Sequence, residues 1–149
     1  METSRIIASG ALLFNEHNKF LLVQPSYKPD WEIPGGIVEK NESPLDACER
    51  EILEEIGLTL KVNSLLSVVY TPKENQHSDK IQFIFDGGIL SESEIAKMKP
   101  DGKEIISFKF VKMEEAKNLL GSRIIPRIKL ALANRDINGN TFANFNDIL

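Results

Sequence analysis

The stretch that decides the fold of this chain is GIVEKNESPLDACEREILEEIGL, residues 36–58. Ser43 followed by Pro44 predicts a helix start, because serine caps free backbone amides and proline fits the first helical position. Gly57 suits the residue just beyond the end of this helix. The helix should pack on the core through a stripe of apolar residues spaced three and four apart, which are Leu45, Cys48, Ile52 and Ile56.

Three glutamates share one face of this predicted helix, beside the apolar stripe. Glu51, Glu54 and Glu55 stand at positions i, i+3 and i+4, where side chains are neighbours. Like charges at this spacing destabilise an exposed helix by roughly 0.2–0.5 kcal/mol per pair. A hard divalent metal that prefers oxygen ligands would neutralise them. The alternative is a solvated charged face with Arg50 and Lys40 nearby.

The bulk composition bounds the class of protein. The chain has 149 residues, of which 42% are hydrophobic and 27% charged, and it suits one globular domain over residues 1–149. The formal net charge of −4 gives no general attraction to a nucleic acid polymer or a membrane surface. Cys48 is the single cysteine, which excludes an intrachain disulfide. We find no signal peptide and no membrane-length apolar run, so a cytoplasmic protein is expected.

The remaining chain predicts an α/β (α+β) fold with a mixed sheet between helical layers. The predicted strands cover residues 5–14, 20–24, 59–70, 80–90 and 105–111, the first two joined as a hairpin and 59–70 forming one strand or two. Residues 31–33 should form a short extended piece that ends at Pro34 and the two glycines after it. The further predicted helices cover residues 91–98, 114–120 and 124–134. Residues 71–79 should form a mobile loop. The weakly patterned tail from 136 to 149 is expected to be partly disordered.

At its fixed positions the stretch 36–58 resembles the Nudix box of the Nudix (MutT-like) hydrolase family, Gly-x5-Glu-x7-Arg-Glu-U-x-Glu-Glu-x-Gly-U, where U is a bulky aliphatic residue. Ile52 and Leu58 occupy the aliphatic positions, and the lead from Trp31 to Gly36 also matches the family. Because common residues occur at about 5–7% each, a chance match is on the order of 10⁻⁸ per starting point. The matching fixed residues are Gly36, Glu42, Arg50, Glu51, Glu54, Glu55 and Gly57.

The resemblance implies the Nudix fold, a mixed β-sheet sandwiched between helices. It also implies hydrolysis of a nucleoside diphosphate linked to another moiety, with water attacking phosphorus and with Mg²⁺, or Mn²⁺ in its place, as cofactor. A nucleoside triphosphate and a nucleoside diphosphate sugar such as ADP-ribose are both compatible substrates. Family members are often dimers, so a homodimer is expected.

Two other functions stay open on the sequence. One is a non-catalytic Nudix module that binds a nucleotide and regulates a partner, although such modules usually lose carboxylates of the box. The other is RNA decapping. An enzyme of that kind needs a positively charged surface along which RNA can bind, and the net charge of −4 disfavours it.

The resemblance further implies roles for residues of the box. The metal ligands are expected to be oxygen atoms, from the side chains of Glu51, Glu54 and Glu55 and from the backbone of Gly36 or its neighbour Gly35. Arg50 can pair with Glu42 or with a metal-binding carboxylate and fix its rotamer, a task that suits a guanidinium fork. Gly36, Glu42 and Gly57 support the structure of the box.

The general base is open between Glu54 or Glu55 in the box and Glu104, just before the strand at 105–111. For Glu104 the alternative is an exposed turn residue.

The substrate contacts rest on weaker signals. Tyr27 and Trp31 are candidates to stack on a base, although Trp31 suits the core equally well. Lys28 and Lys103 are candidates to contact phosphate, as are Lys73 and Lys80, and each alone is more often plain surface. His77, in the loop 71–79, is interpreted as surface.

Overall fold

The computed structural model describes residues 4–74 and 78–149, so His77 lies outside the described residues. The strands are β1 (Ile6–Phe14), β2 (Phe20–Pro25), β3 (Gly35–Ile37), β4 (Ser64–Thr71), β5 (Lys80–Ile89), β6 (Ile105–Val111) and β7 (Thr141–Asn144). The helices are α1 (Pro44–Ile56), α2 (Glu92–Lys97), α3 (Met113–Ala116), α4 (Ile125–Asp136) and the short 3₁₀ helix η1 (Phe145–Asp147).

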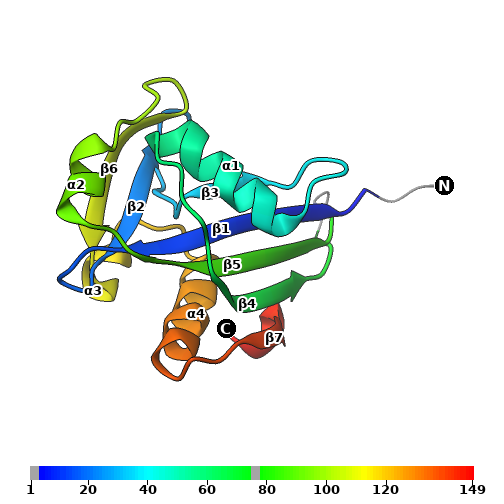
Figure 1. Ribbon diagram of the computed structural model, residues 1–149. Helices are drawn as coiled ribbons and strands as arrows, with labels where there is room; N and C mark the ends of the chain where they lie inside the picture. Colours follow the sequence, from blue (N-terminus) through cyan, green and yellow to red (C-terminus); the bar gives the residue numbers. More distant parts are fainter. Residues whose placement is uncertain (1–3, 75–77) are drawn as a thin grey trace.

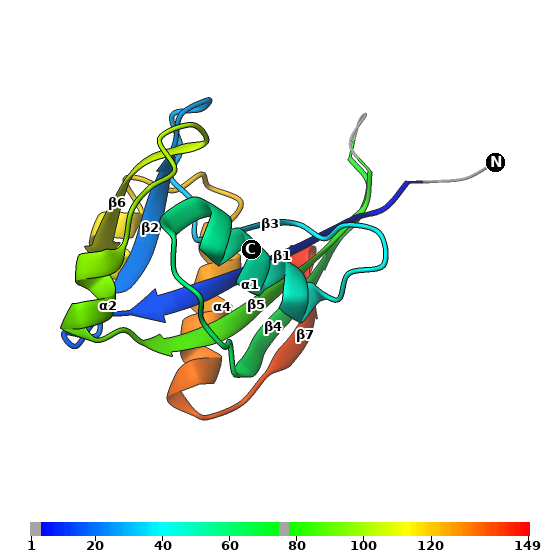
Figure 2. The same cartoon turned by 45° about the horizontal axis from the view of Figure 1, so that its top comes forward.

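These strands join in one mixed sheet (Figure 1). Their order is β6-β2-β1-β5-β4-β7, and β3 pairs with β1 beside this path. One edge of β1 pairs with β5 in parallel, and the other edge is divided between β3, at Ala8–Gly10, and β2, at Phe14. Helices α1 and α4 lie on opposite sides of the sheet, which Figure 2 shows from a second direction. The predicted mixed sheet between helices is confirmed.

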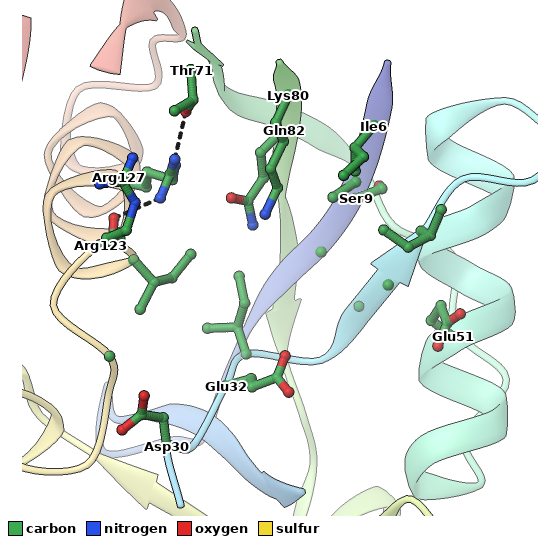
Figure 3. Close-up of a pocket in the computed structure, with 18 of the residues that line it drawn as sticks. Ile6, Ser9, Asp30, Glu32, Glu51, Thr71, Lys80, Gln82, Arg123 and Arg127 are labelled. Atoms are coloured by element: carbon green, nitrogen blue, oxygen red, sulfur yellow. Dashed lines mark hydrogen bonds between the residues drawn. The ribbon is translucent and has the colours of Figure 1, made fainter. Parts of the chain in front are cut away.

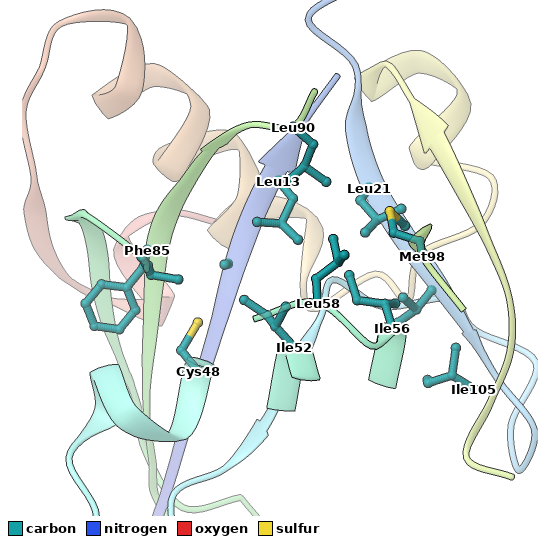
Figure 4. Close-up of a cluster of buried hydrophobic side chains, with 13 residues drawn as sticks. Leu13, Leu21, Cys48, Ile52, Ile56, Leu58, Phe85, Leu90, Met98 and Ile105 are labelled. Carbon is teal, nitrogen blue, oxygen red and sulfur yellow. The ribbon is translucent and has the colours of Figure 1, made fainter. Parts of the chain in front are cut away.

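The side chains of β1 alternate between two hydrophobic clusters, one on each face of the sheet. Ala11 and Leu13 belong to the cluster beneath α1 (Figure 4). Leu12 and Phe14 belong to the cluster beneath α4. All four are buried, as expected for a strand covered on both faces. β1 therefore fixes the position of α1 and α4 relative to each other.

Helix α1 begins and ends where the sequence predicts. The Ser43 hydroxyl accepts a hydrogen bond from the Asp46 amide at 3.0 Å, which caps the first turn. Gly57 follows the last turn with a φ of 76°, a left-handed conformation that favours glycine, and its amide bonds to the Leu53 carbonyl.

The apolar stripe of α1 was predicted correctly except at its first member. Cys48, Ile52 and Ile56 are fully buried, whereas Leu45 is 36% exposed. The first turn of α1 contacts β1 through its backbone instead, because the Ser9 hydroxyl donates to the Pro44 carbonyl at 2.6 Å.

The extended piece expected at 31–33 is present, but the regular strand lies further along the chain than expected. Trp31 and Glu32 form only isolated bridges, and the regular strand is β3, at the glycines that were expected to end it. The absence of side chains explains the shift, since a Cβ on Gly35 would lie 2.3 Å from the Ser9 carbonyl oxygen. Glycine therefore lets the start of the box pair closely with β1.

Two further predicted elements are shorter in the structure. Strand β4 begins only at Ser64, because the preceding segment packs Leu58 and Val62 into the cluster beneath α1. Helix α3 ends at Ala116. Beyond it the chain turns, and the Leu119 carbonyl accepts a hydrogen bond from the Trp31 amide at 2.9 Å.

The tail was expected to be partly disordered, and this was wrong. β7 pairs in parallel with β4, and Phe145 behind it is only 1% exposed. The guanidinium groups of Arg123 and Arg127 lie over the Phe145 ring, at 4.6 and 4.4 Å from its centroid. Asn134 donates to the Leu66 carbonyl at 2.7 Å and holds the end of α4 on β4.

No helix in residues 4–74 and 78–149 has the length and apolar character needed to cross a membrane. The assignment of the whole chain to one domain stays a prediction.

The packed tail predicts that Phe145→Ala lowers the free energy of unfolding by about 3–5 kcal/mol, the cost of truncating a buried phenylalanine. The matched control is Phe142→Ala in β7, where the ring is 64% exposed and truncation should change stability by about 0.5 kcal/mol or less. Urea unfolding measures both. Equal and small losses for the two variants would contradict a packed tail.

Candidate active site

The described residues form a pocket of about 1110 Å³, slightly larger than most small-molecule sites. Figure 3 shows it between α1 and the start of α4, with β5, β1 and β3 as its floor. The box glutamates Glu51 and Glu55 line one end, and Lys80, Gln82, Arg123 and Arg127 line the other. Charge is thus unevenly divided along the pocket.

The acidic end gathers carboxylates from three segments of the chain. Glu51 and Glu55 come from α1, Glu32 from the lead into the box, and Glu104 from the loop before β6. Glu55 is only 7% exposed, and its carboxylate accepts a hydrogen bond from the Gly35 amide at 2.8 Å. Helix α1 therefore presents a buried acid at its inner edge, which is unlike the solvated face that the sequence left as the alternative.

Burial shifts the protonation of both α1 acids. It raises the pKa of Glu55 to about 8; the bond from Gly35 opposes this rise, and the charges of Glu51, Glu32 and Glu104 add to it. Burial also raises the pKa of Glu51, against the opposing effect of Arg50. This end of the pocket is therefore short of positive charge.

Arg50 contacts three of the four fixed glutamates of the box, Glu42, Glu51 and Glu54. Its Nε and Nη2 donate to the two oxygens of Glu42, at 2.7 and 3.0 Å, as a fork. Its Nη1 donates to Glu51 Oε1 at 2.9 Å and lies 3.3 Å from Glu54 Oε2. These bonds lower the pKa of Glu42 and raise that of Arg50. Arg50 therefore fixes the Glu51 rotamer.

Gly36 lies against the Glu51 carboxylate. A Cβ at Gly36 would stand 2.5 Å from the carboxylate carbon, a distance that side chains do not tolerate. The position must therefore stay without a side chain for Glu51 to reach its place beside β3.

The donor set of the acidic end fits a hard divalent cation, because every candidate ligand is an oxygen atom. In the described chain no three His, Cys, Asp or Glu side chains already converge as a metal site. The reason is local, since Glu51 and Glu54 turn toward Arg50 and Glu55 toward Gly35. Arg50 engages only one oxygen of Glu51, which leaves Oε2 for a further partner.

The structure brings most of the predicted site residues to this pocket but not all of them. The predicted residues that line it are Tyr27, Lys28, Trp31, Gly36, Glu51, Glu55, Lys80 and Glu104. Tyr27 and Lys28 both contact the Glu32 carboxylate, at 3.2 and 3.3 Å.

The predicted site residues that do not line the pocket are Glu42, Arg50, Glu54, Gly57, Lys73 and Lys103. Arg50 and Glu42 lie behind Glu51, and the Glu54 side chain is 55% exposed beside them. Lys103 contacts the Ser26 hydroxyl through its backbone carbonyl, so its position is set by the loop rather than by the pocket.

Gln82, Arg123 and Arg127 line the pocket and were missed from the sequence. Arg127 stands in a predicted helix among apolar residues, and Gln82 alternates with phenylalanines in a predicted strand. Neither pattern distinguishes a pocket residue from a surface residue.

A family model described as NUDIX domain matches residues 4–130. An ADP-ribose pyrophosphatase of Methanocaldococcus jannaschii is 39% identical over 92 residues, which cover 57% of this chain and 54% of that protein. A Bacillus subtilis protein provisionally named 8-oxo-dGTP diphosphatase is 34% identical over 100 residues, covering 67% of this chain and 62% of that protein. The chain thus spans somewhat more than half the length of these two relatives.

Solved structures share the fold over nearly the whole chain. The MutT protein from Methanosarcina mazei superposes with a TM-score of 0.72 at 26% identity and covers 93% of this chain and 98% of that one. A NUDIX hydrolase from Nitrosomonas europaea superposes with a TM-score of 0.77 at 21% identity, covering 97% of this chain and 80% of that one, and shows the fold alone.

The contact between Gly36 and Glu51 predicts that Gly36→Ala weakens Mn²⁺ binding about tenfold or more, because the added methyl group displaces the carboxylate. Titration with Mn²⁺ followed by electron paramagnetic resonance measures the affinity. Gly139→Ala is the matched control, since a Cβ there meets only the flexible Ile137 side chain at 3.3 Å. Wild-type affinity in Gly36→Ala would show that Glu51 does not need this approach.

Proposed function

This chain belongs to the Nudix family, and we propose that it is a metal-dependent pyrophosphohydrolase. It cleaves a nucleoside diphosphate linked to another moiety by attack of water on phosphorus. The observation that carries the proposal is the complete box of carboxylates, with Glu55 buried and Glu51 partly buried against a pocket of about 1110 Å³. The relatives named as a pyrophosphatase and a diphosphatase support the same reaction class.

The acids of α1, with the backbone of Gly36, would hold Mg²⁺ or Mn²⁺. When bound, such a cation neutralises the diphosphate oxygens and lowers the pKa of coordinated water. Arg50 keeps Glu51 in one rotamer by bonding Oε1 and leaves Oε2 for the ligand. The Gly35 amide does the same for Glu55. The protein thus orients both carboxylates before substrate arrives.

We assign the general base to Glu104 rather than to Glu54 or Glu55. Glu55 is bonded to Gly35, and Glu54 lies beside Arg50 outside the pocket lining. Glu104 lines the pocket from the loop before β6, and its charge acts on both Glu51 and Glu55. It can therefore accept a proton from water without giving up a position in the box.

The non-catalytic alternative lacks a supporting observation, since every box carboxylate is present and held in place. A nucleoside triphosphate and a nucleoside diphosphate sugar remain the two substrate types, and one relative is named for each. The homodimer and the cytoplasmic location stay predictions.

The proposal predicts that Glu51→Gln and Glu54→Gln each lower turnover on the order of 100-fold or more at saturating Mg²⁺, because each removes a charge that the cation needs. The matched control is Glu114→Gln, an exposed residue of α3, which should keep wild-type turnover.

A panel of nucleoside triphosphates and nucleoside diphosphate sugars, with Mg²⁺ or Mn²⁺, provides the measurement. Phosphate is assayed after inorganic pyrophosphatase or alkaline phosphatase, which separates released pyrophosphate from released monophosphates. Unchanged turnover in both variants would reject the catalytic assignment, and tight nucleotide binding without turnover would favour the regulatory module.

A further inference from the structure

The end of the pocket away from Glu51 is built by β5, β4 and the start of α4. Lys80 and Gln82 stand two residues apart on β5 and therefore project to the same face. Figure 3 shows them between Arg123 and Arg127 on one side and strand β3 on the other. In the sheet register Gln82 pairs with Ala8, and Ala8 with Ile37, so two strand spacings, about 10 Å, separate β5 from β3. A nucleoside whose phosphates lie at the acidic end reaches across this separation.

This end of the pocket is rich in hydrogen-bond donors. Arg127 is only 4% exposed, and its Nη1 and Nη2 donate to the Arg123 carbonyl and the Thr71 hydroxyl, both at 2.6 Å. Its Nε is buried and has no partner in the described residues. Burial and the charge of Arg127 lower the pKa of Lys80, whose ammonium group adds further donors. A ligand here must therefore offer an acceptor.

Gln82, in contrast, requires a hydrogen-bond donor from the ligand. Its Oε1 is buried and has no hydrogen-bond partner within the described chain. A phosphate or a carboxylate would satisfy Lys80 but not this acceptor, because the anion has no proton to donate. A buried acceptor without a donor is unfavourable, so the missing group should carry an N–H. The Lys80 donor and the Gln82 acceptor together fit a ligand that has a C=O group next to an N–H group.

The pocket also offers an aromatic surface. Trp31 lines it and is partly buried against the cluster beneath α4. Aromatic rings stack favourably on planar heterocycles, so a lining tryptophan suits a base. A sugar or a simple anion does not use such a ring as well as a base does.

We propose that this end of the pocket binds the nucleobase of the substrate and selects bases that carry a keto oxygen beside a ring N–H. Lys80 donates to the keto oxygen, and Gln82 accepts from the ring N–H. Guanine, hypoxanthine, uracil and thymine have this edge, whereas adenine and cytosine place an amino donor against Lys80. The inference rests on the proposed function, since it takes the acidic end as the phosphate site.

The test uses pairs of nucleoside monophosphates that differ only at this edge, IMP against AMP and UMP against CMP. Binding is measured in EDTA, so neither metal nor turnover is required. Trp31 is the only tryptophan of the chain, and its fluorescence reports occupation of the pocket. We expect IMP and UMP to bind about tenfold more tightly than their partners.

Two variants locate the selection. Lys80→Met and Gln82→Leu should each remove most of the preference by weakening IMP and UMP, with AMP and CMP little changed. Lys97→Met on the exposed surface of α2 is the matched control and should keep the preference. Circular dichroism confirms that each variant folds, and either pocket variant alone suffices for the test.

Equal binding within both pairs overturns the proposal. A Lys80→Met variant that weakens all four nucleotides equally also overturns it, because Lys80 would then contact the shared phosphate. Failure of hydrolysis leaves this test intact, since it measures binding alone. Conversely, hydrolysis together with equal binding of the bases would support the proposed pyrophosphohydrolase activity and reject only the proposed base selection.

Discussion

The guanidinium of Arg50 is the interaction on which the site depends. It bonds both oxygens of Glu42, one oxygen of Glu51 and the carbonyl of Ile37, and it lies beside Glu54. It thereby joins the loop before α1, the helix itself and the end of β3. Without it the carboxylates of one helix face would repel each other, and the Glu51 side chain would have no fixed direction. The Arg50 guanidinium fixes the positions of these carboxylates. It does not contact Glu55, so the inner edge of α1 still has more negative than positive charge.

That local order acts within a pocket whose two ends have opposite character. α1 supplies acids at one end, while β5 and the start of α4 supply lysine, arginine and amide groups at the other. An elongated anionic substrate with a neutral, hydrogen-bonding end would meet a cation at the acidic end and donors at the far end. β1 pairs with β3 on one edge and with β5 on the other, so it connects the strands that line the two ends. Orientation of the substrate then follows from the fold.

Much of the fold and about a third of the residues that line the pocket followed from local sequence signals. The caps of α1 are short-range contacts, so Ser43 and Gly57 marked its ends correctly. β3 was misplaced because the glycines that usually break strands here permit close approach to β1. The tail was misjudged because its order comes from β4, a strand some seventy residues earlier in the chain. Local propensity carries no information about such partners.

The sequence by itself determined the acidic centre, because the box lies within 23 consecutive residues and one helical period places its glutamates together. Only the tertiary structure decided what faces that centre. Arg127 meets Thr71 across 56 residues, and Gln82 reaches the pocket through the register of β5 with β1. It also decided that Glu55 is buried whereas Glu54 is exposed, although they are adjacent in the sequence. Burial depends on which surface packs against the helix, and that surface is assembled from distant strands.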